Sequence, residues 1–237
     1  MSYTSAFFQT QAPGSRQSAD RIAAIIVDQL HPNSVVDLGC GVGTWLAAFQ
    51  RLGVERVEGY DGDYVDRSLL QIPAASFHAI DLSSALSEGK PLGSFDLAVS
   101  LEVGEHLPPA ASAALVDRLT SLAPAVLFSA AIPRQSGTDH INERWQSDWA
   151  RMFAVHGYHP HDAVRPLVWD DPGVEPWYAQ NALLYLREPS PEPPMLDLVH
   201  PRLWEKNLAN ASIRAQVQHR LRSLFWTAVE RVRGQRG

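Results

Sequence analysis

The residues best suited to bind a ligand lie in a glycine-rich turn near the start of the chain. Gly39, Gly41 and Gly43 alternate with other residues directly after a β-branched apolar run. Glycine permits positive φ angles and lets a ligand lie against the backbone. A helical pattern follows at once, and the first turn of a helix offers unpaired N–H groups. The turn therefore predicts a site for a ligand that lies flat on the backbone.

Acidic residues flank this turn and narrow the kind of ligand. The spacing G-x-G-x-G is one residue shorter than the G-x-G-x-x-G of dinucleotide sites. Asp37 precedes the turn, where a carboxylate would repel a pyrophosphate but would hold an ammonium group. Asp61, next to Gly62, follows the second apolar run about twenty residues after the turn, where an acid can accept hydrogen bonds from both ribose hydroxyls. These residues favour a nucleoside that carries an amino group.

Two of the nine histidines, His106 and His140, follow runs that we expect to end at the ligand edge of a sheet. A histidine removes a proton from a hydroxyl well near neutral pH. We predict His140, in the polar loop 137–143, as the general base; the alternative is a loop histidine that caps the next helix. For His106 we predict a contact to the acceptor or a role as base, or else a place on the cofactor side.

The loop around His140 also holds oxygen donors for a metal ion, at Asp139, Asn142 and Glu143. Magnesium prefers oxygen ligands and could hold adjacent oxygens of a small substrate. Only one or two side chains from so short a loop can converge on one point. The sequence therefore predicts no metal.

Short apolar runs alternate with longer helical patterns along most of the chain. We predict strands at residues 34–38, 56–60, 76–80, 95–101 and 125–130, closing strands at 164–169 and 179–186, and helices at 15–30, 44–52, 109–122 and 142–156. Such alternation implies parallel βαβ crossovers. The predicted fold class is α/β: a Rossmann-like, doubly wound, mostly parallel seven-stranded sheet with helices on both faces and a C-terminal helical extension.

Three segments are predicted along the chain. Residues 1–32 form an N-terminal lid segment and helix, residues 33–188 form the core, and residues 189–237 form a proline-rich linker and a C-terminal helix. Proline excludes both a helix and a central strand from the linker. The apolar stripe of the last helix, near residues 211–232, predicts packing on the core or on a second copy of the chain, which would give a homo-oligomer.

Bulk properties exclude several classes of protein. The chain of 237 residues carries a formal net charge of −6, which disfavours a nucleic-acid partner. The exception is a group of arginines near the C-terminus, at Arg214, Arg220, Arg222, Arg231, Arg233 and Arg236. No run approaches the ~20 apolar residues of a membrane span, and the first residues do not resemble a signal peptide. The single cysteine, Cys40, cannot form an internal disulfide, and we expect a cytoplasmic protein.

The stretch D-L-G-C-G-V-G at residues 37–43 resembles motif I of the class I S-adenosylmethionine-dependent methyltransferases. The resemblance covers about residues 1–188 and looks like a bacterial subgroup that methylates small molecules. Its further matches are G-D-Y-V-D after Asp61, S-L-E-V with E-H-L at 100–107, S-A-A-I-P at 129–133, H-I-N-E-R-W at 140–145 and W-Y-A-Q-N at 177–181.

The resemblance implies S-adenosyl-L-methionine as methyl donor and S-adenosylhomocysteine as product. It implies that Asp81 meets the adenine amine and Leu82 lies near the ring, although Asp81 could instead cap a helix that begins at Ser83. It places Leu101 and Glu102 beside the methionine portion and the acceptor. With the glycine turn, Asp37, Asp61 and Gly62, these residues form the predicted cofactor site.

The function predicted from these features is O-methylation of a small polar acceptor such as a sugar or a secondary metabolite. Oxygen is favoured over nitrogen or carbon because a histidine base is available, although a carboxylate acceptor would need none. The alternatives are an RNA or protein methyltransferase, an NAD-dependent oxidoreductase, and a non-catalytic scaffold that binds the cofactor. The glycine spacing opposes the oxidoreductase, and the acidic charge opposes RNA.

Overall fold

The computed structural model describes residues 5–82, 92–135 and 137–210, and divides the chain into two compact units, residues 1–200 and 201–237. The first unit is built around one seven-stranded sheet. Of the second unit, residues 201–210 are described and are helical. The predicted helix from Ser83 and the predicted C-terminal helix with its apolar stripe lie outside the described residues.

The strands follow the order β3-β2-β1-β4-β5-β7-β6 across the sheet. They are β1 (Ser34–Leu38), β2 (Arg56–Asp61), β3 (Phe77–Ala79), β4 (Leu97–Leu101), β5 (Ala125–Ser129), β6 (His159–His161) and β7 (Leu183–Leu186). The first five pair in parallel, whereas β7 is antiparallel to both β5 and β6. The strand order reverses between β1 and β4, and open α/β sheets bind their ligands at such a reversal.

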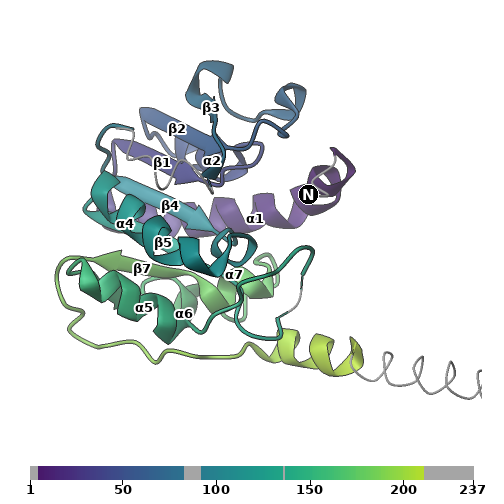
Figure 1. Cartoon of the computed structure of the whole chain (residues 1–237), viewed down its shortest axis with the longest axis vertical. Coiled ribbons are helices and arrows are strands. Elements are labelled where there is room, and N and C mark those ends of the chain that lie inside the picture. Colours follow the sequence, from purple (N-terminus) through teal and green to yellow (C-terminus); the bar gives the residue numbers. More distant parts are fainter. Residues whose placement is uncertain (1–4, 83–91, 136, 211–237) are drawn as a thin grey trace, which may run out of the picture. The chain divides into compact units, whose positions relative to one another are not determined.

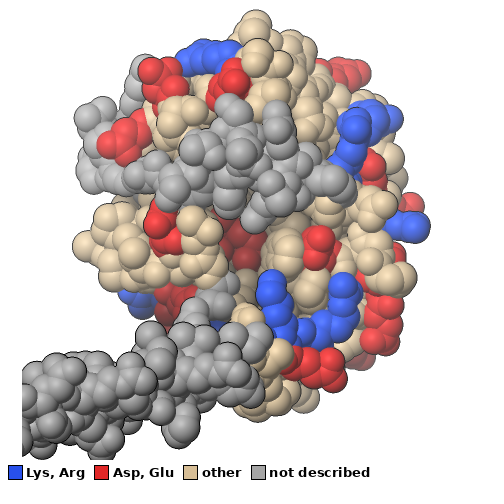
Figure 2. All heavy atoms as spheres, turned by 90° about the vertical axis from the view of Figure 1, so that its right-hand side faces the viewer, with Lys and Arg blue, Asp and Glu red and all other residues tan. Residues whose placement is uncertain are grey.

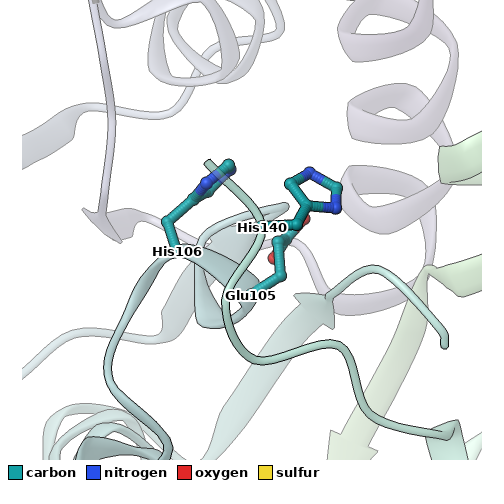
Figure 3. A group of neighbouring side chains, drawn as sticks. All are labelled: Glu105, His106 and His140. Carbon is teal, nitrogen blue, oxygen red and sulfur yellow. The ribbon is translucent and has the colours of Figure 1, made fainter. Parts of the chain in front are cut away.

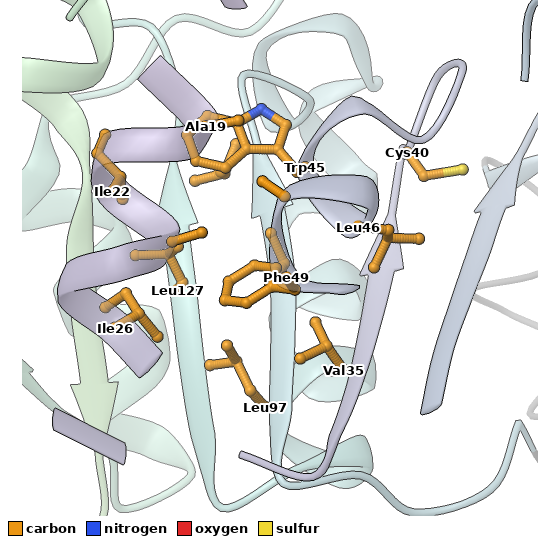
Figure 4. Close-up of a cluster of buried hydrophobic side chains, with 14 of the residues drawn as sticks. Ala19, Ile22, Ile26, Val35, Cys40, Trp45, Leu46, Phe49, Leu97 and Leu127 are labelled. Carbon is orange, nitrogen blue, oxygen red and sulfur yellow. The ribbon is translucent and has the colours of Figure 1, made fainter. Parts of the chain in front are cut away.

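Helices cover both faces of the sheet, as Figure 1 shows. One face packs against α1 (Ser5–Leu30), α2 (Thr44–Arg51), α6 (Arg165–Val168) and α7 (Pro176–Asn181), and the other against α4 (Ser112–Leu122) and α5 (Gln146–Val155). The central strands are apolar on both faces, since successive side chains alternate between the two cores. In Figure 4, Ile22 and Ile26 of α1 and Phe49 of α2 lie over Leu97 and Leu127 of the sheet. The predicted fold class is confirmed for this unit.

Both closing strands differ from the prediction. Residues 164–169 are not a strand, because α6 occupies them: Val164 and Val168 are buried four residues apart, which is helical spacing, while Leu167 between them is exposed. A proline in the first turn favours this helix. Pro176 likewise begins α7, and this helix covers the residues at which the second closing strand was expected to begin. The strand β7 starts only at Leu183.

The strand β6 was not predicted, because His-Pro-His carries no strand signal. It lies at the edge of the sheet, where a proline without an N–H group is tolerated.

The N-terminal and proline-rich segments also differ in extent from the prediction. The first helix begins at Ser5 and takes in the segment that was predicted as a lid. Residues 189–200 contain neither helix nor strand. They are held against the sheet and its helices within the first unit. Arg165 donates a hydrogen bond of 2.7 Å to the carbonyl of Met195, and Ser147 binds the Asp197 carboxylate through both its N–H and its hydroxyl.

Candidate functional site

The predicted site residues gather at the carboxyl edge of the parallel strands. Figure 2 looks onto this edge, which is the right-hand side of Figure 1. Acidic atoms are visible in a recess near its middle, while lysine and arginine side chains occur in small groups rather than as a continuous stripe. The site has a backbone part after β1 and β2 and a side-chain part after β4 and β5.

The glycine turn is built as the sequence predicts. Gly39, Gly41 and Gly43 have φ angles of 91°, 54° and 81°, a backbone region that residues other than glycine rarely adopt. A Cβ atom on Gly39 would lie 2.3 Å from the nearest side-chain carbon of Val103, and one on Gly43 would lie 2.8 Å from Ile72. The contact with Val103 also places the turn directly beside the segment that follows β4.

Asp61 holds this turn in place. One carboxylate oxygen accepts a hydrogen bond of 2.6 Å from the N–H of Gly41, and the other accepts from the N–H of Gly62 and from the hydroxyl of Tyr64. Asp61 is 5% exposed, so its orientation is set before any ligand arrives. A carboxylate has about four acceptor positions, and one therefore remains for a ligand hydroxyl.

Asp37 is a buried carboxylate beside the turn. No group among the described residues donates a hydrogen bond to its side chain, and it is 2% exposed. Burial, and then the charge of Asp61, raises the pKa of Asp37 well above its usual range. A cationic ligand group would remove this cost, because an opposite charge favours the ionised form. The predicted contact between Asp37 and an ammonium group fits this environment.

Asp81 and Leu82, at the end of β3, have opposite surroundings. Asp81 is exposed, whereas Leu82 is buried in the core on the α4 and α5 side of the sheet. Leu101, the last residue of β4, is also buried.

Glu102 follows Leu101 with a φ angle of 55°, which is strained for a residue with a side chain. Its two carboxylate oxygens accept hydrogen bonds from Asn181 at 3.2 Å and from Gln135 at 3.0 Å. Burial raises the pKa of Glu102 to about 7, although these amides oppose the shift. Gln180 and Asn181 are buried and bind Gln135, so their amides orient Glu102 rather than face an acceptor.

A second group of side chains consists of Glu105, His106 and His140, which Figure 3 shows converging from two segments of the chain. Their ligand-type atoms all lie within 4.8 Å of one another. Glu105 is fully buried, and burial with the charge of Glu102 raises the pKa of its carboxyl well above the usual range. The rings of His106 and His140 meet edge to face, with centroids 4.9 Å apart. We call these three residues the Glu–His–His cluster.

Backbone contacts hold the two segments of the cluster together. The N–H groups of Ile141 and Asn142 donate to the Glu105 carbonyl at 2.9 and 3.0 Å. The side-chain amide of Asn142 donates to the Gly104 carbonyl and to the Ser112 hydroxyl. The loop that carries His140 is therefore fixed against the short 3₁₀ helix of residues 104–106, which carries the other two members.

Both histidines have one ring nitrogen engaged by an acceptor. Nδ1 of His140 lies 3.0 Å from a carboxylate oxygen of Glu143, and Nδ1 of His106 lies 3.4 Å from the carbonyl of Asp139. Carbonyl and carboxylate oxygens only accept hydrogen bonds, so Nδ1 carries the proton in each ring. Burial, followed by the nearby His140, lowers the pKa of His106 to about 4, which leaves its ring neutral at neutral pH.

The structure thus brings the predicted residues into two adjacent groups. Asp37, Asp61 and the glycines form one, and His106 and His140 form the other, while Asp81 stands exposed at the end of β3. Glu105 and Gln135 were not predicted as site residues. Glu105 lies in the stretch E-H-L that carries part of the family resemblance, but the sequence assigned it no role, and Gln135 gave no signal.

The family of the chain follows from comparison with known proteins. Residues 8–165 match a family model described as a methyltransferase domain. This is more than half of the chain, so the chain belongs to that family, and the predicted class I S-adenosylmethionine-dependent methyltransferase is confirmed. The chain is accordingly an enzyme whose methyl donor is S-adenosylmethionine.

Solved structures share this fold at low sequence identity. An O-methyltransferase family protein from Burkholderia thailandensis is 14% identical with a TM-score of 0.58, over 79% of this chain and 60% of its own. Magnesium protoporphyrin IX methyltransferase from Synechocystis, with bound SAH, is 19% identical with a TM-score of 0.54, over 79% of this chain and 90% of its own. A sugar N-methyltransferase from Streptoalloteichus is 12% identical with a TM-score of 0.59, over 77% of this chain and 92% of its own.

At such low sequence identity, these similarities establish the fold but do not identify the molecule that accepts the methyl group. No protein of curated function matches the sequence. Among the described residues, no helix is long and apolar enough to cross a membrane.

Proposed function

We propose that this protein transfers a methyl group from S-adenosylmethionine to an oxygen atom of a small polar acceptor. The observation that carries the proposal is the contact between the two groups of the site: the glycine turn packs on Val103, two residues before Glu105 and three before His106. A ligand on the turn would thus lie beside the Glu–His–His cluster.

The residues of the backbone part would hold the cofactor. The bare backbone of Gly39, Gly41 and Gly43 would receive its flat body, because side chains there would occupy the same space. Asp37 would pair with the ammonium of the methionine portion, and Asp61 would accept a hydrogen bond from a ribose hydroxyl at the one acceptor position that it keeps. Asp81 and Leu82 would meet the adenine. The bound cofactor supplies an electrophilic methyl group on a sulfonium.

The side-chain part would receive the acceptor. An acceptor hydroxyl must lose its proton, and its oxygen then bonds to the methyl carbon as the carbon–sulfur bond breaks and its electron pair stays on sulfur. With Nδ1 protonated, Nε2 of His140 and of His106 keeps a lone pair for this proton. We retain His140 as the general base predicted from the sequence, with His106 as a contact to the acceptor. Alignment of the acceptor supplies the rest of the acceleration.

The alternatives have less support. The family match opposes an NAD-dependent oxidoreductase and a non-catalytic scaffold. An RNA or protein acceptor would need a broad docking surface, and the face in Figure 2 carries charges of both signs without a basic stripe among the described residues. The neighbouring folds include O-methyltransferases and a sugar N-methyltransferase, so the acceptor atom itself is part of the proposal.

Calorimetry and an acceptor screen test the proposal. We expect S-adenosylmethionine and S-adenosylhomocysteine to bind, and NADH to give no heat. The screen would offer labelled S-adenosylmethionine with sugars, phenols, carboxylic acids, amines and oligonucleotides, with S-adenosylhomocysteine release as the readout. Label on a small hydroxyl compound is the expected result. Transfer only to amines or only to oligonucleotides would refute O-methylation of a small acceptor.

Two further predictions belong to this proposal. A cytoplasmic location fits the lone thiol of Cys40, which is free and buried. Self-association through the C-terminal helix stays a prediction, since that helix lies outside the described residues.

A further inference from the structure

The Glu–His–His cluster has the composition of a metal site. One carboxylate and two imidazoles, from residues 105, 106 and 140, bring their donor atoms within 4.8 Å of one another. We propose that Glu105, His106 and His140 bind a divalent transition-metal cation. The proposal deepens the proposed function and rests on it for the role of the cation, which would hold the acceptor oxygen next to the methyl donor. Because the cation would occupy Nε2 of His140, it would take over from that residue as the group that promotes loss of the acceptor proton, which would pass to water.

Glu105 gives the first argument. It is fully buried, and neither carboxylate oxygen has a hydrogen bond of ordinary geometry among the described residues, while the side chain of Glu102 and the backbone of Ala131 lie close to it. A buried carboxylate without a partner is costly, and proteins normally pair such a group or let it bind a metal. No lysine or arginine among the described residues forms a salt bridge with Glu105. A cation between Glu105 and the two rings would satisfy it.

The hydrogen bonds of the histidines give the second argument. Histidines that bind metals almost always donate their other ring N–H group to a carboxylate or a backbone carbonyl, which fixes the tautomer. His140 does so to Glu143, and His106 does so to the carbonyl of Asp139. Both rings therefore keep the lone pair on Nε2, and both acceptors lie outside the group of donor atoms.

The geometry gives the third argument. Protein ligands lie about 2.0–2.2 Å from such a cation, so two ligand atoms of a tetrahedral site are roughly 3.4 Å apart. The donor atoms of the cluster lie within 4.8 Å of one another, and side-chain rotations would have to bring them closer to bind the cation. The backbone around the cluster is held in strained conformations, with φ angles of 55° at Glu102 and 57° at Asp139, and such strain is concentrated at functional sites.

The donor set favours a transition metal over magnesium. Imidazole suits zinc, iron, cobalt and related cations, whereas magnesium prefers a shell of oxygens. Three protein ligands leave at least one position open, as in catalytic zinc sites. From the sequence we weighed a different group of donors, Asp139, Asn142 and Glu143 around His140, and predicted no metal. In the structure, Asn142 clamps the loop and Glu143 orients His140, so neither is free to act as a ligand.

Titration with Co²⁺ tests the site directly. Protein freed of metal by a chelator is titrated with cobalt chloride, and the visible absorption of bound Co²⁺ is recorded. We expect one saturable band per chain, which Zn²⁺ displaces. The variants Glu105→Gln, His106→Ala and His140→Ala should each weaken Co²⁺ binding by roughly 10- to 100-fold or more.

His156→Ala is the matched control. His156 ends α5 and lies 3.8 Å from the carboxylate of Asp117, so it too is a histidine beside an acid, but it lies outside the cluster. Its removal should leave Co²⁺ binding unchanged. Glu105 is buried, and Glu105→Gln could therefore disturb folding; the two histidine variants, at partly exposed positions, keep the test decisive.

The outcomes separate this inference from the proposed function. Absence of a Co²⁺ band in the wild type, or equal binding by all three variants, would overturn the metal site. If the metal-free protein still binds S-adenosylhomocysteine in that case, the proposed function stands without the metal. Conversely, Co²⁺ binding that depends on His106 and His140, with no binding of the nucleoside, would support the cation site and refute the proposed function.

Discussion

The two halves of the site are built in different ways. The glycine turn after β1 offers backbone, and its geometry follows from five consecutive sequence positions with two nearby acids. The Glu–His–His cluster offers side chains, and they come from two segments that lie more than thirty positions apart in the sequence. The glycine turn can be predicted from the sequence because its conformation depends on residues that are close together in the chain. The second depends on which loops meet at the edge of the sheet.

The largest effect should come from the backbone half. At Gly41, with a φ angle of 54°, valine would both strain the turn and fill the space for the ligand. We expect Gly41→Val to lose detectable binding of S-adenosylhomocysteine in calorimetry. Gly53→Ala is the control for backbone strain, because Gly53 has a φ angle of 96° and open space around it. Wild-type affinity in Gly41→Val would disprove the placement of the cofactor.

A change in the side-chain half should separate binding from turnover. His140→Ala should leave the affinity for S-adenosylhomocysteine intact and lower kcat by roughly 100-fold or more, because the group that receives or displaces the acceptor proton is lost. Steady-state kinetics with the acceptor found in the screen would measure kcat, and His156→Ala would serve as the control variant. Unchanged kcat would remove His140 from the reaction.

Asp37 links function to stability. Asp37→Asn removes the charge that would face the ammonium, and we expect cofactor affinity to fall by roughly 10- to 100-fold. The same change should stabilise the ligand-free protein. Burial raises the pKa of Asp37 in the folded state, so ionisation costs stability from the unfolded pKa, about 4, upward.

The gain in Tm of Asp37→Asn over the wild type should therefore be small at low pH. It should grow as the pH rises above the unfolded pKa and level off above the folded pKa. Thermal melts across the pH range test the sign, and a gain that shrinks with rising pH would contradict it.

The smallest effect should come from Tyr64, whose hydroxyl donates to the Asp61 carboxylate while its ring is half exposed. Tyr64→Phe removes one hydrogen bond from a carboxylate that keeps two others, from Gly41 and Gly62. We expect cofactor affinity to change by roughly threefold or less. A change as large as that of Asp37→Asn would mean that Tyr64 contacts the cofactor itself.

The same difference between local and distant features explains where the predicted strands were wrong. The five parallel strands were predicted because each is a short apolar run between turn signals. The apolar run at 164–169 was misread, since a proline and a spacing of four between Val164 and Val168 fit a helix better than a strand. The edge strand β6 exists only because β7 offers it hydrogen-bonding partners.

The sequence by itself determined the backbone half of the site. Positive φ angles and close approach of a ligand to the backbone require glycines at set spacings, and Asp37 and Asp61 stand at fixed offsets from these glycines. Only the tertiary structure decided that Glu105 is buried beside His106 and His140, and that Gln135 and Asn181 hold Glu102. The physical reason is that burial and convergence depend on the packing of segments distant in the chain, which no local pattern encodes.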